Sequence, residues 1–196
     1  MDFLNRIKKE MSEGIARAIF EDAGYRVIDS GIEKVLRELS CLSTIEYHAL
    51  GFPNAMNLLP DFTVMTRDQD KKFLVEVKYR SHWSKSIFDE VRDQVAVFGE
   101  MILVSVNATA EDPKGYNLPT RFIRCCSLRL HNGVYQVELR AQNREQAWFP
   151  VDEVNDGAHL WWKMSYLSEK FELLSETKNS KTLTLAVGAL EGILAH

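Results

Sequence analysis

Two carboxylates and a lysine carry the clearest chemical signal in the sequence. Asp61 follows Pro60, and Glu76-Val77-Lys78 begins fifteen positions later. Carboxylate oxygens are ligands that Mg²⁺ prefers, and a metal ion can stabilise the charge that develops during phosphodiester hydrolysis. The spacing is therefore typical of a metal-and-lysine hydrolytic site. It also fits an amphipathic strand that exposes Glu76 and Lys78 to solvent.

The residues around this pattern predict a β-hairpin, because two strand-like runs flank a polar segment. The runs are 61–66 and 73–79, and the polar segment is 67–72. We place the centre of the turn between Gln69 and Asp70. Asp61 then lies opposite Lys78 and diagonal to Glu76 on one face. Opposed residues are about 5 Å apart and diagonal ones roughly 7–8 Å, so both carboxylates would share one cation with the ammonium beside it.

Composition indicates one domain, or one domain with an appendage, because the chain has 196 residues of which 45% are hydrophobic. No apolar stretch is long enough to span a membrane and the start does not resemble a secretory signal, so we expect a cytoplasmic protein without membrane contact. The three cysteines have no CxxC spacing and are expected to be reduced thiols. The net charge of −4 argues against a general nucleic-acid coat but allows a local site.

The order of expected elements predicts an α/β fold, with a central mixed sheet flanked by helices. A helix, a strand, a helix, the hairpin, a helix and a buried strand fill a core at 1–110. A C-terminal extension at 111–196 adds a hairpin at Asn132-Gly133 and a long amphipathic helix from Leu160 to Leu174. Whether core and extension form one domain is left open. The main expected elements are helices at 3–24, 32–39 and 87–98, a strand at 101–106 and a final apolar segment at 183–194.

Basic residues suggest where a nucleic acid would bind. Five arginines and one acid occupy 121–144, whereas 145–177 holds seven acids. Arg124 and Arg129 are candidate phosphate contacts on this segment, and Arg80 and Lys85 are candidates near the end of the motif strand. The alternative is a solvated hairpin whose arginines pair with the acidic helix that follows.

In its motif and its order of expected elements, the chain resembles the PD-(D/E)XK, or restriction-endonuclease-like, nuclease superfamily. Pro60-Asp61 matches PD, Glu76-Val77-Lys78 matches (D/E)XK, and the element order over about half of the chain is similar to the superfamily core. The resemblance implies a restriction-endonuclease-like fold in which Asp61 and Glu76 bind Mg²⁺, with Mn²⁺ as a substitute. It also implies that Val77 lends a backbone carbonyl to the metal and that Lys78 orients or deprotonates water.

Two further positions follow from the resemblance. Members often carry a glutamate on the first helix near the metal, for which Glu13 is the best match and Glu10 the second. Several place a glutamine in the helix after the motif, sometimes as QxxxY, and Gln94 matches with Phe98 in place of the tyrosine. Gln94 is thus a candidate nucleic-acid contact. The alternatives are a solvent-facing charge for Glu13 and a polar residue bordering an apolar stripe for Gln94.

We therefore expect a Mg²⁺-dependent nuclease that hydrolyses DNA, in particular an endonuclease. The alternative is a non-catalytic module that keeps the nuclease-like fold to bind nucleic acid or a protein partner. Intact Asp61, Glu76 and Lys78 favour the enzyme. By analogy with nucleases that cut two strands, the apolar face from Leu160 to Leu174 is a candidate homodimer surface.

Overall fold

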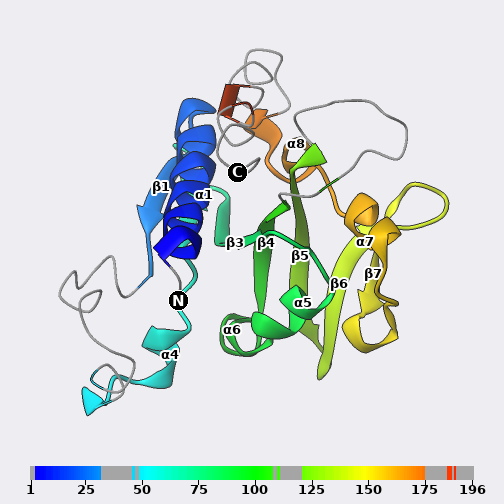
Figure 1. The fold of residues 1–196 in the computed structure, drawn as a ribbon, viewed down its shortest axis with the longest axis horizontal. Helices are drawn as coiled ribbons and strands as arrows, with labels where there is room; N and C mark the ends of the chain where they lie inside the picture. Colours follow the sequence, from blue (N-terminus) through cyan, green and yellow to red (C-terminus); the bar gives the residue numbers. More distant parts are fainter. Residues whose placement is uncertain are drawn as a thin grey trace.

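A seven-stranded open sheet flanked by helices forms the fold of the chain (Figure 1). The computed structural model describes residues 3–31, 46, 49–107, 110, 121–174, 185, 186 and 188. Its elements are α1 (Phe3–Asp22), β1 (Arg26–Asp29), α4 (Asn54–Asn57), β2 (Phe62–Met65), β3 (Lys72–Arg80), α5 (Ser86–Glu90), α6 (Arg92–Phe98), β4 (Glu100–Asn107), β5 (Ile123–His131), β6 (Val134–Arg140), β7 (Gln146–Pro150), η3 (Val151–Glu153), α7 (Ala158–Lys163), α8 (Leu167–Lys170) and η4 (Glu172–Leu174).

The strands lie in the sheet in the order of the chain, from β1 to β7. Only the pair β3–β4 is parallel, and the other neighbours are antiparallel. A parallel pair needs a crossover connection, which α5 and α6 supply between β3 and β4. The predicted mixed α/β layer is confirmed. The boundary that we placed near residue 110 falls between β4 and β5, which are neighbours in this one sheet.

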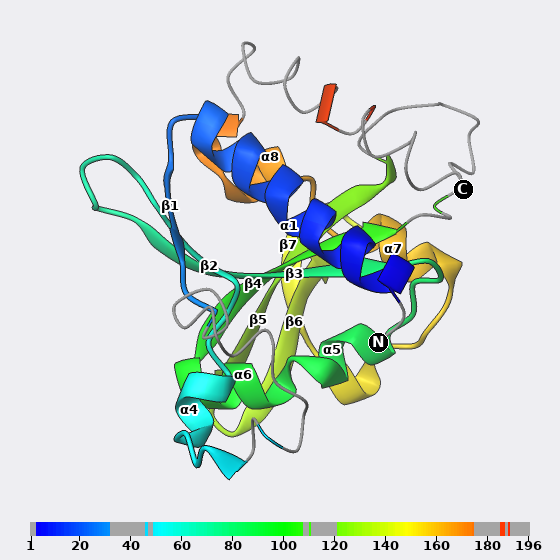
Figure 2. The same ribbon diagram turned by 60° about the vertical axis from the view of Figure 1, so that its left-hand side comes forward.

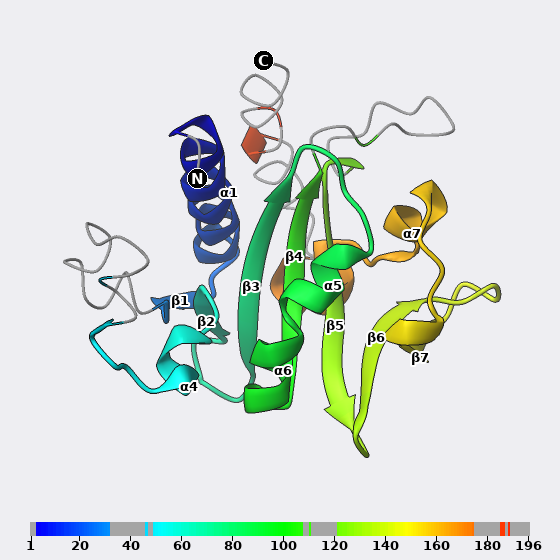
Figure 3. The same ribbon diagram turned by 60° about the horizontal axis from the view of Figure 1, so that its bottom comes forward.

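Helices cover both faces of the sheet (Figures 2 and 3). Alternate residues of β3 point to opposite faces. On one face, Phe73 contacts Phe171, with ring centroids 5.1 Å apart, and Phe20 of α1 lies 4.5 Å from the same ring. On the other face, Gln94 of α6 bonds Glu76. The strand that carries the motif is thus held between α1 on one side and α5–α6 on the other.

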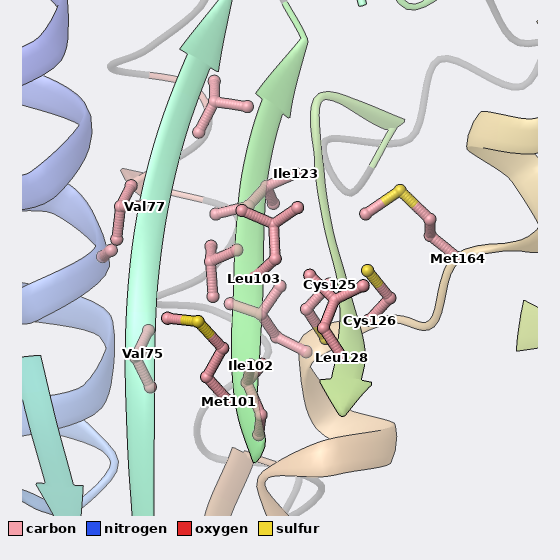
Figure 4. Packing of buried hydrophobic residues seen from close by; sticks show 14 of the residues in the cluster. Val75, Val77, Met101, Ile102, Leu103, Ile123, Cys125, Cys126, Leu128 and Met164 are labelled. Carbon is pink, nitrogen blue, oxygen red and sulfur yellow. The ribbon is translucent and has the colours of Figure 1, made fainter. Parts of the chain in front are cut away.

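The core is built from apolar side chains of the central strands (Figure 4). Val75 and Val77 of β3 and Leu103 of β4 are each at most 1% exposed. Cys125 and Cys126 of β5 are fully buried free thiols, as expected for reduced cysteines, whereas Cys41 lies outside the described residues. Because β4 is buried on both faces, its sequence is nearly continuously apolar, and the strand predicted at 101–106 is confirmed.

The helix predicted at the start of the chain is confirmed by α1. Gly24 has a φ of 97°, and its amide donates to the Glu21 carbonyl. A glycine in this left-handed conformation ends a helix at little steric cost. The chain then turns directly into β1, and Tyr25 packs edge-on against Phe20 at 6.2 Å.

The predicted hairpin is confirmed as β2–β3, but its predicted register is wrong. Phe62 pairs with Val75, two positions from the partner that our turn centre assigns to it. The turn is centred one residue earlier in the chain than we predicted. It is closed by two hydrogen bonds, from the Gln69 amide to the Thr66 carbonyl and from the Thr66 amide to the Lys71 carbonyl. Gln69 adopts a φ of 64°, which a non-glycine residue rarely does. The shift places Asp61 directly beside Glu76 instead of diagonal to it.

The predicted Asn-Gly hairpin is also confirmed, as β5–β6. Asn132 and Gly133 have φ values of 51° and 77°, the pair of positive angles that a type I′ turn requires. The strand β7 was not predicted. Its burial is intermediate at every position, so it lacks the alternation that marks a half-buried strand.

The long helix predicted from Leu160 to Leu174 is wrong. The segment forms α7, α8 and η4, because Ser165 exchanges two backbone hydrogen bonds with Cys125, at 2.8 and 3.0 Å, and leaves the helical conformation. Its apolar side chains face the core of the same chain, so they offer no homodimer surface. These buried residues are Leu160, Met164, Leu167, Phe171 and Leu174.

Smaller differences concern other helices. The helix predicted at 87–98 is two helices, α5 and α6, separated at Val91, which has a φ of −105° and a ψ of 4°. The helix predicted at 32–39 lies outside the described residues, as does most of the apolar segment 183–194. Among the helices that the structure describes, none has the length and apolar character needed to cross a bilayer.

Candidate functional site

Asp61 and Glu76 meet where β2 begins beside the middle of β3. Asp61 is 7% exposed and precedes the first residue of β2. Its Oδ2 accepts a hydrogen bond of 2.8 Å from the Val77 amide, and its own amide donates to Glu76 Oε2 at 3.2 Å. The Asp61 carboxylate is therefore fixed by the amide next to Glu76, and the Glu76 carboxylate by the amide of Asp61.

Glu76 has two further partners. Gln94 of α6 donates its side-chain amide to Oε2 at 3.0 Å, and Lys78 places Nζ 2.5 Å from Oε1. Glu76 is 4% exposed, whereas the Lys78 side chain is 23% exposed. The lysine thus links the buried carboxylate to solvent, and the predicted grouping of Asp61, Glu76 and Lys78 is present in the structure.

Glu13 approaches the pair from α1. It is 2% exposed, so it is not the solvent-facing helix charge that we considered as an alternative. Lys9, one helical turn earlier, has Nζ 3.5 Å from Glu13 Oε1. The second candidate, Glu10, points outward, with a side chain that is 62% exposed and paired with Arg6. Glu13 is therefore the acid of α1 that belongs to the site.

The electrostatics of the site are dominated by Asp61. Burial, followed by the charges of Glu76 and Glu13, raises the pKa of Asp61 from its ordinary 3.8 to about 8. The Val77 amide and Lys9 act in the opposite direction but are weaker. Burial first, and then two neighbouring carboxylates, thus favour the protonated form of Asp61 near neutral pH. Such a cluster is what a divalent cation would neutralise.

The donor atoms suit Mg²⁺. They are hard carboxylate oxygens, and Mg²⁺ is usually bound by one or two carboxylates while it keeps several waters. As they stand, no three or more His, Cys, Asp or Glu side chains in the described residues are arranged to hold a metal ion. In this arrangement both oxygens of Glu76 and one of Asp61 accept protein hydrogen bonds. The fit is therefore to a two-carboxylate Mg²⁺ site completed by water, and not to a closed protein cage.

Lys9 is the site residue that our sequence reasoning missed. A signal for it was present, because Lys9 precedes Glu13 by four positions and side chains at that spacing lie side by side on a helix. The spacing alone does not mark a buried site, because charged pairs of this kind are common on exposed helices. Here the glutamate is buried, and the lysine borders the carboxylate cluster.

The predicted nucleic-acid contacts near the motif have different surroundings. Gln94 is 8% exposed and supports Glu76, so its amide faces the site and not the outer surface. Arg80 is partly exposed at the end of β3, where it pairs with Glu90. The backbone amide of Lys85 bonds the Asp156 carboxylate at 3.1 Å. Arg80 and Lys85 are both intermediate in exposure.

The two predicted contacts on β5, Arg124 and Arg129, differ in exposure. Arg124 is 3% exposed and donates to the Met164 carbonyl at 3.0 Å, with Trp162 and Tyr166 rings 4.7 and 4.6 Å from its guanidinium. The structure contradicts Arg124 as a surface contact, because the turn between α7 and α8 encloses it. Arg129 is intermediate in exposure and lies 3.9 Å from the Trp148 ring.

The alternative for the basic segment, pairing with the acids that follow, is present in the structure. Arg140 donates to both carboxylate oxygens of Glu169, at 2.6 and 2.7 Å, and Lys170 pairs with Glu138. The same guanidinium nitrogen, Nη2, makes both Arg140 contacts, which are charge-assisted hydrogen bonds. The arginine-rich hairpin is thus joined to α8 by charge as well as by packing.

Comparison with known protein families, curated proteins and solved structures finds no match to the chain.

Proposed function

We propose that this chain is a Mg²⁺-dependent nuclease that hydrolyses phosphodiester bonds of DNA as an endonuclease. The observation that carries the proposal is the buried cluster of Asp61, Glu76 and Glu13 with Lys78 at its solvent side. Burying three carboxylates together costs folding free energy, and strongly shifted pKa values of this kind gather at functional sites.

The order of elements supports a restriction-endonuclease-like core. The chain runs from α1, which carries Glu13, through β1 and the β2–β3 hairpin to α5–α6 and β4. This is the order expected from the resemblance to the PD-(D/E)XK superfamily, with the acidic residues on the expected elements. The strands that follow, from β5 onward, extend the same sheet.

Asp61 and Glu76 would hold the metal ion, with the Val77 carbonyl as the third protein ligand. When bound, Mg²⁺ supplies a positive charge that stabilises the phosphoryl oxygens and the leaving oxygen during hydrolysis. The carboxylates are already oriented for this role. The Val77 amide fixes Asp61, and the Asp61 amide together with Gln94 fixes Glu76. Because these hydrogen bonds are already formed, the two carboxylates need not reorient during the reaction.

Lys78 orients the attacking water. Its Nζ is held by Glu76 Oε1 at 2.5 Å, and its side chain reaches the solvent. An ammonium in this position can donate hydrogen bonds to water and to the phosphate at the same time. Glu13 adds negative charge from the α1 side, where Lys9 balances it.

The proposal is tested by incubating supercoiled plasmid, single-stranded DNA and branched DNA with the protein, in Mg²⁺ and in chelator. We expect nicked or linear plasmid only with Mg²⁺. The isosteric variants Asp61→Asn and Glu76→Gln, and Lys78→Met, should lose cutting while circular dichroism shows an intact fold.

The matched control is Asp152→Asn, which neutralises a carboxylate that is 79% exposed and pairs with Arg92. It should cut like the wild type. Equal cutting by all three site variants would refute the site assignment. DNA binding by the wild type without any cutting would instead favour the non-catalytic module.

A further inference from the structure

A pocket of about 400 Å³ adjoins the carboxylate cluster at the end of β3 where the strand leaves the sheet. Its lining includes Lys9 from α1, Glu90 from α5, and the consecutive residues Lys78, Tyr79, Arg80 and Ser81. Lys78 belongs to both features, because it also bonds Glu76 at 2.5 Å. The pocket is therefore continuous with the candidate catalytic site.

The charge of the pocket is positive. Lys9, Lys78 and Arg80 contribute three cations, and Glu90 is the acid among the lining residues. Arg80 donates to the Tyr79 carbonyl at 2.7 Å and pairs with Glu90, and the Arg80 side chain remains 33% exposed. Exposed ion pairs are weak in water, so an incoming anion can take the place of Glu90 beside the guanidinium. The Lys9 side chain, 39% exposed, is also accessible to solvent.

Tyr79 also lines this pocket. The residue is 9% exposed, and its hydroxyl is buried with no hydrogen-bond partner in the described part of the chain. Buried hydroxyls without a partner are uncommon, and each calls for an explanation. A ligand oxygen that reaches this hydroxyl from the pocket would give it an acceptor.

We propose that this pocket binds the backbone phosphate next to the scissile phosphate on the same DNA strand. Two cationic side chains, Lys9 and Arg80, supply charge-assisted hydrogen bonds, and Ser81 and Tyr79 supply hydroxyl donors. The volume is near the lower end for ligand pockets, about 300–1,000 Å³, which suits one phosphate group with its sugar. The inference rests on the proposed nuclease function, since the phosphate is that of the substrate.

The test uses the dependence of DNA affinity on salt. A side chain that neutralises one phosphate contributes about 0.9 to the slope of log K against log salt concentration for duplex DNA, and about 0.7 for a single strand. Affinity is measured by fluorescence anisotropy in chelator, where no cutting is expected, at several KCl concentrations. Because Lys9 and Arg80 share one phosphate, we expect the Lys9→Gln/Arg80→Gln double variant to lower the slope by about one such contribution, and each single variant to lower it by part of that amount.

Lys71→Gln is the matched control. Lys71 adjoins the opposite end of β3 and, like Arg80, pairs with a surface glutamate, here Glu172 at 2.6 Å. Its substitution should leave the slope unchanged. A wild-type slope in the Lys9→Gln/Arg80→Gln double variant would overturn the phosphate subsite, while plasmid cutting by the wild type would still support the nuclease. Absence of DNA binding and cutting by the wild type would overturn both.

Tyr79→Phe tests the neutral donor separately. Removing one hydroxyl without charge should weaken DNA binding by about tenfold or less and leave the salt slope as it is. Because the hydroxyl has no partner among the described residues, the folded state should not be weakened. Unchanged DNA affinity in this variant would remove Tyr79 from the subsite, and a slope reduced in the same variant would contradict its role as an uncharged donor.

Discussion

Gln94 donates its side-chain amide to Glu76 Oε2 across 3.0 Å, from α6 on one face of the sheet to the middle of β3. Both residues are buried, at 8% and 4% exposure. The sequence suggested that Gln94 binds the substrate, but this contact indicates a different role. It fixes the orientation of a candidate metal ligand, and outer partners of this kind tune metal sites.

Replacing Gln94 by leucine should therefore raise the Mg²⁺ concentration needed for half-maximal DNA cutting by about tenfold or more. The measurement is a Mg²⁺ titration of plasmid cleavage rates. Asp93→Asn, at the exposed neighbouring position on α6, is the control and should keep the wild-type titration. The same half-saturation in Gln94→Leu and the wild type would show that the amide does not support a metal ligand.

Asp61 should make the stability of the metal-free protein depend on pH. Its folded-state pKa is raised to about 8, from an ordinary 3.8, chiefly by burial and then by Glu76 and Glu13. The protonated form is favoured in the folded state, so this contribution is complete below about pH 4 and is lost as the pH rises through about 8. The free energy of unfolding should fall by up to about 1.4 kcal/mol per pH unit in that window.

Asp61→Asn removes this titration. In chelator, denaturant unfolding between pH 5 and 8 should give a flatter pH profile for the variant, which becomes more stable than the wild type by a few kcal/mol, to order of magnitude, at pH 8. Asp152→Asn, at an exposed carboxylate, should follow the wild-type profile. Parallel profiles for Asp61→Asn and the wild type would mean that Asp61 is ionised in the folded protein at all of these pH values.

Tyr79→Phe should raise the stability of the DNA-free protein by about 1 kcal/mol, because a buried hydroxyl without a partner costs about 1–3 kcal/mol. The hydroxyl of Tyr79 is buried and has no partner in the described residues. Tyr135→Phe is the contrasting variant. Its hydroxyl donates to the Phe88 carbonyl at 2.6 Å, and its removal should lower stability. The free energy of unfolding is measured by urea denaturation. An equal decrease in both variants would show that the Tyr79 hydroxyl has a hydrogen-bond partner in solution.

A fragment that ends at residue 110 should not fold alone. β5 pairs with β4 over seven residue pairs, and Phe171 packs against Phe20 and Phe73 on the α1 face. Without these partners β4 becomes an apolar edge strand and α1 loses part of its contact surface. Circular dichroism and thermal unfolding of the fragment 1–110 should lack a cooperative transition. A cooperative transition would indicate that the first half is an independent domain.

Much of the fold could be predicted from local patterns. The helix end at Gly24 and the Asn132-Gly133 turn follow from backbone conformations that few residues tolerate, and the buried strand β4 follows from its apolar run. The break between α7 and α8 could not be predicted, because its cause is the pairing of Ser165 with Cys125, forty positions earlier in the chain. Helical periodicity carries no information on such a distant backbone contact.

The sequence predicted which residues form the candidate site better than it predicted how they are arranged. Asp61, Glu76, Lys78 and Glu13 come together as the motif and element order indicate. The register depended on Gln69 taking a left-handed conformation, which neither hydrophobic pattern nor residue type indicates. Arg124 looked like a surface cation because its enclosure by Trp162 and Tyr166 depends on the same unpredicted break.

Manganese binding tests the central claim most directly, because it reports on the carboxylates without requiring a substrate. Titration with Mn²⁺, followed by electron paramagnetic resonance of the free ion, should reveal binding by the wild type and by the Glu172→Gln control. Binding should be lost or weakened by at least about tenfold in Asp61→Asn and Glu76→Gln. Absence of Mn²⁺ binding by the wild type, or undiminished binding by both site variants, would contradict a metal site at Asp61 and Glu76.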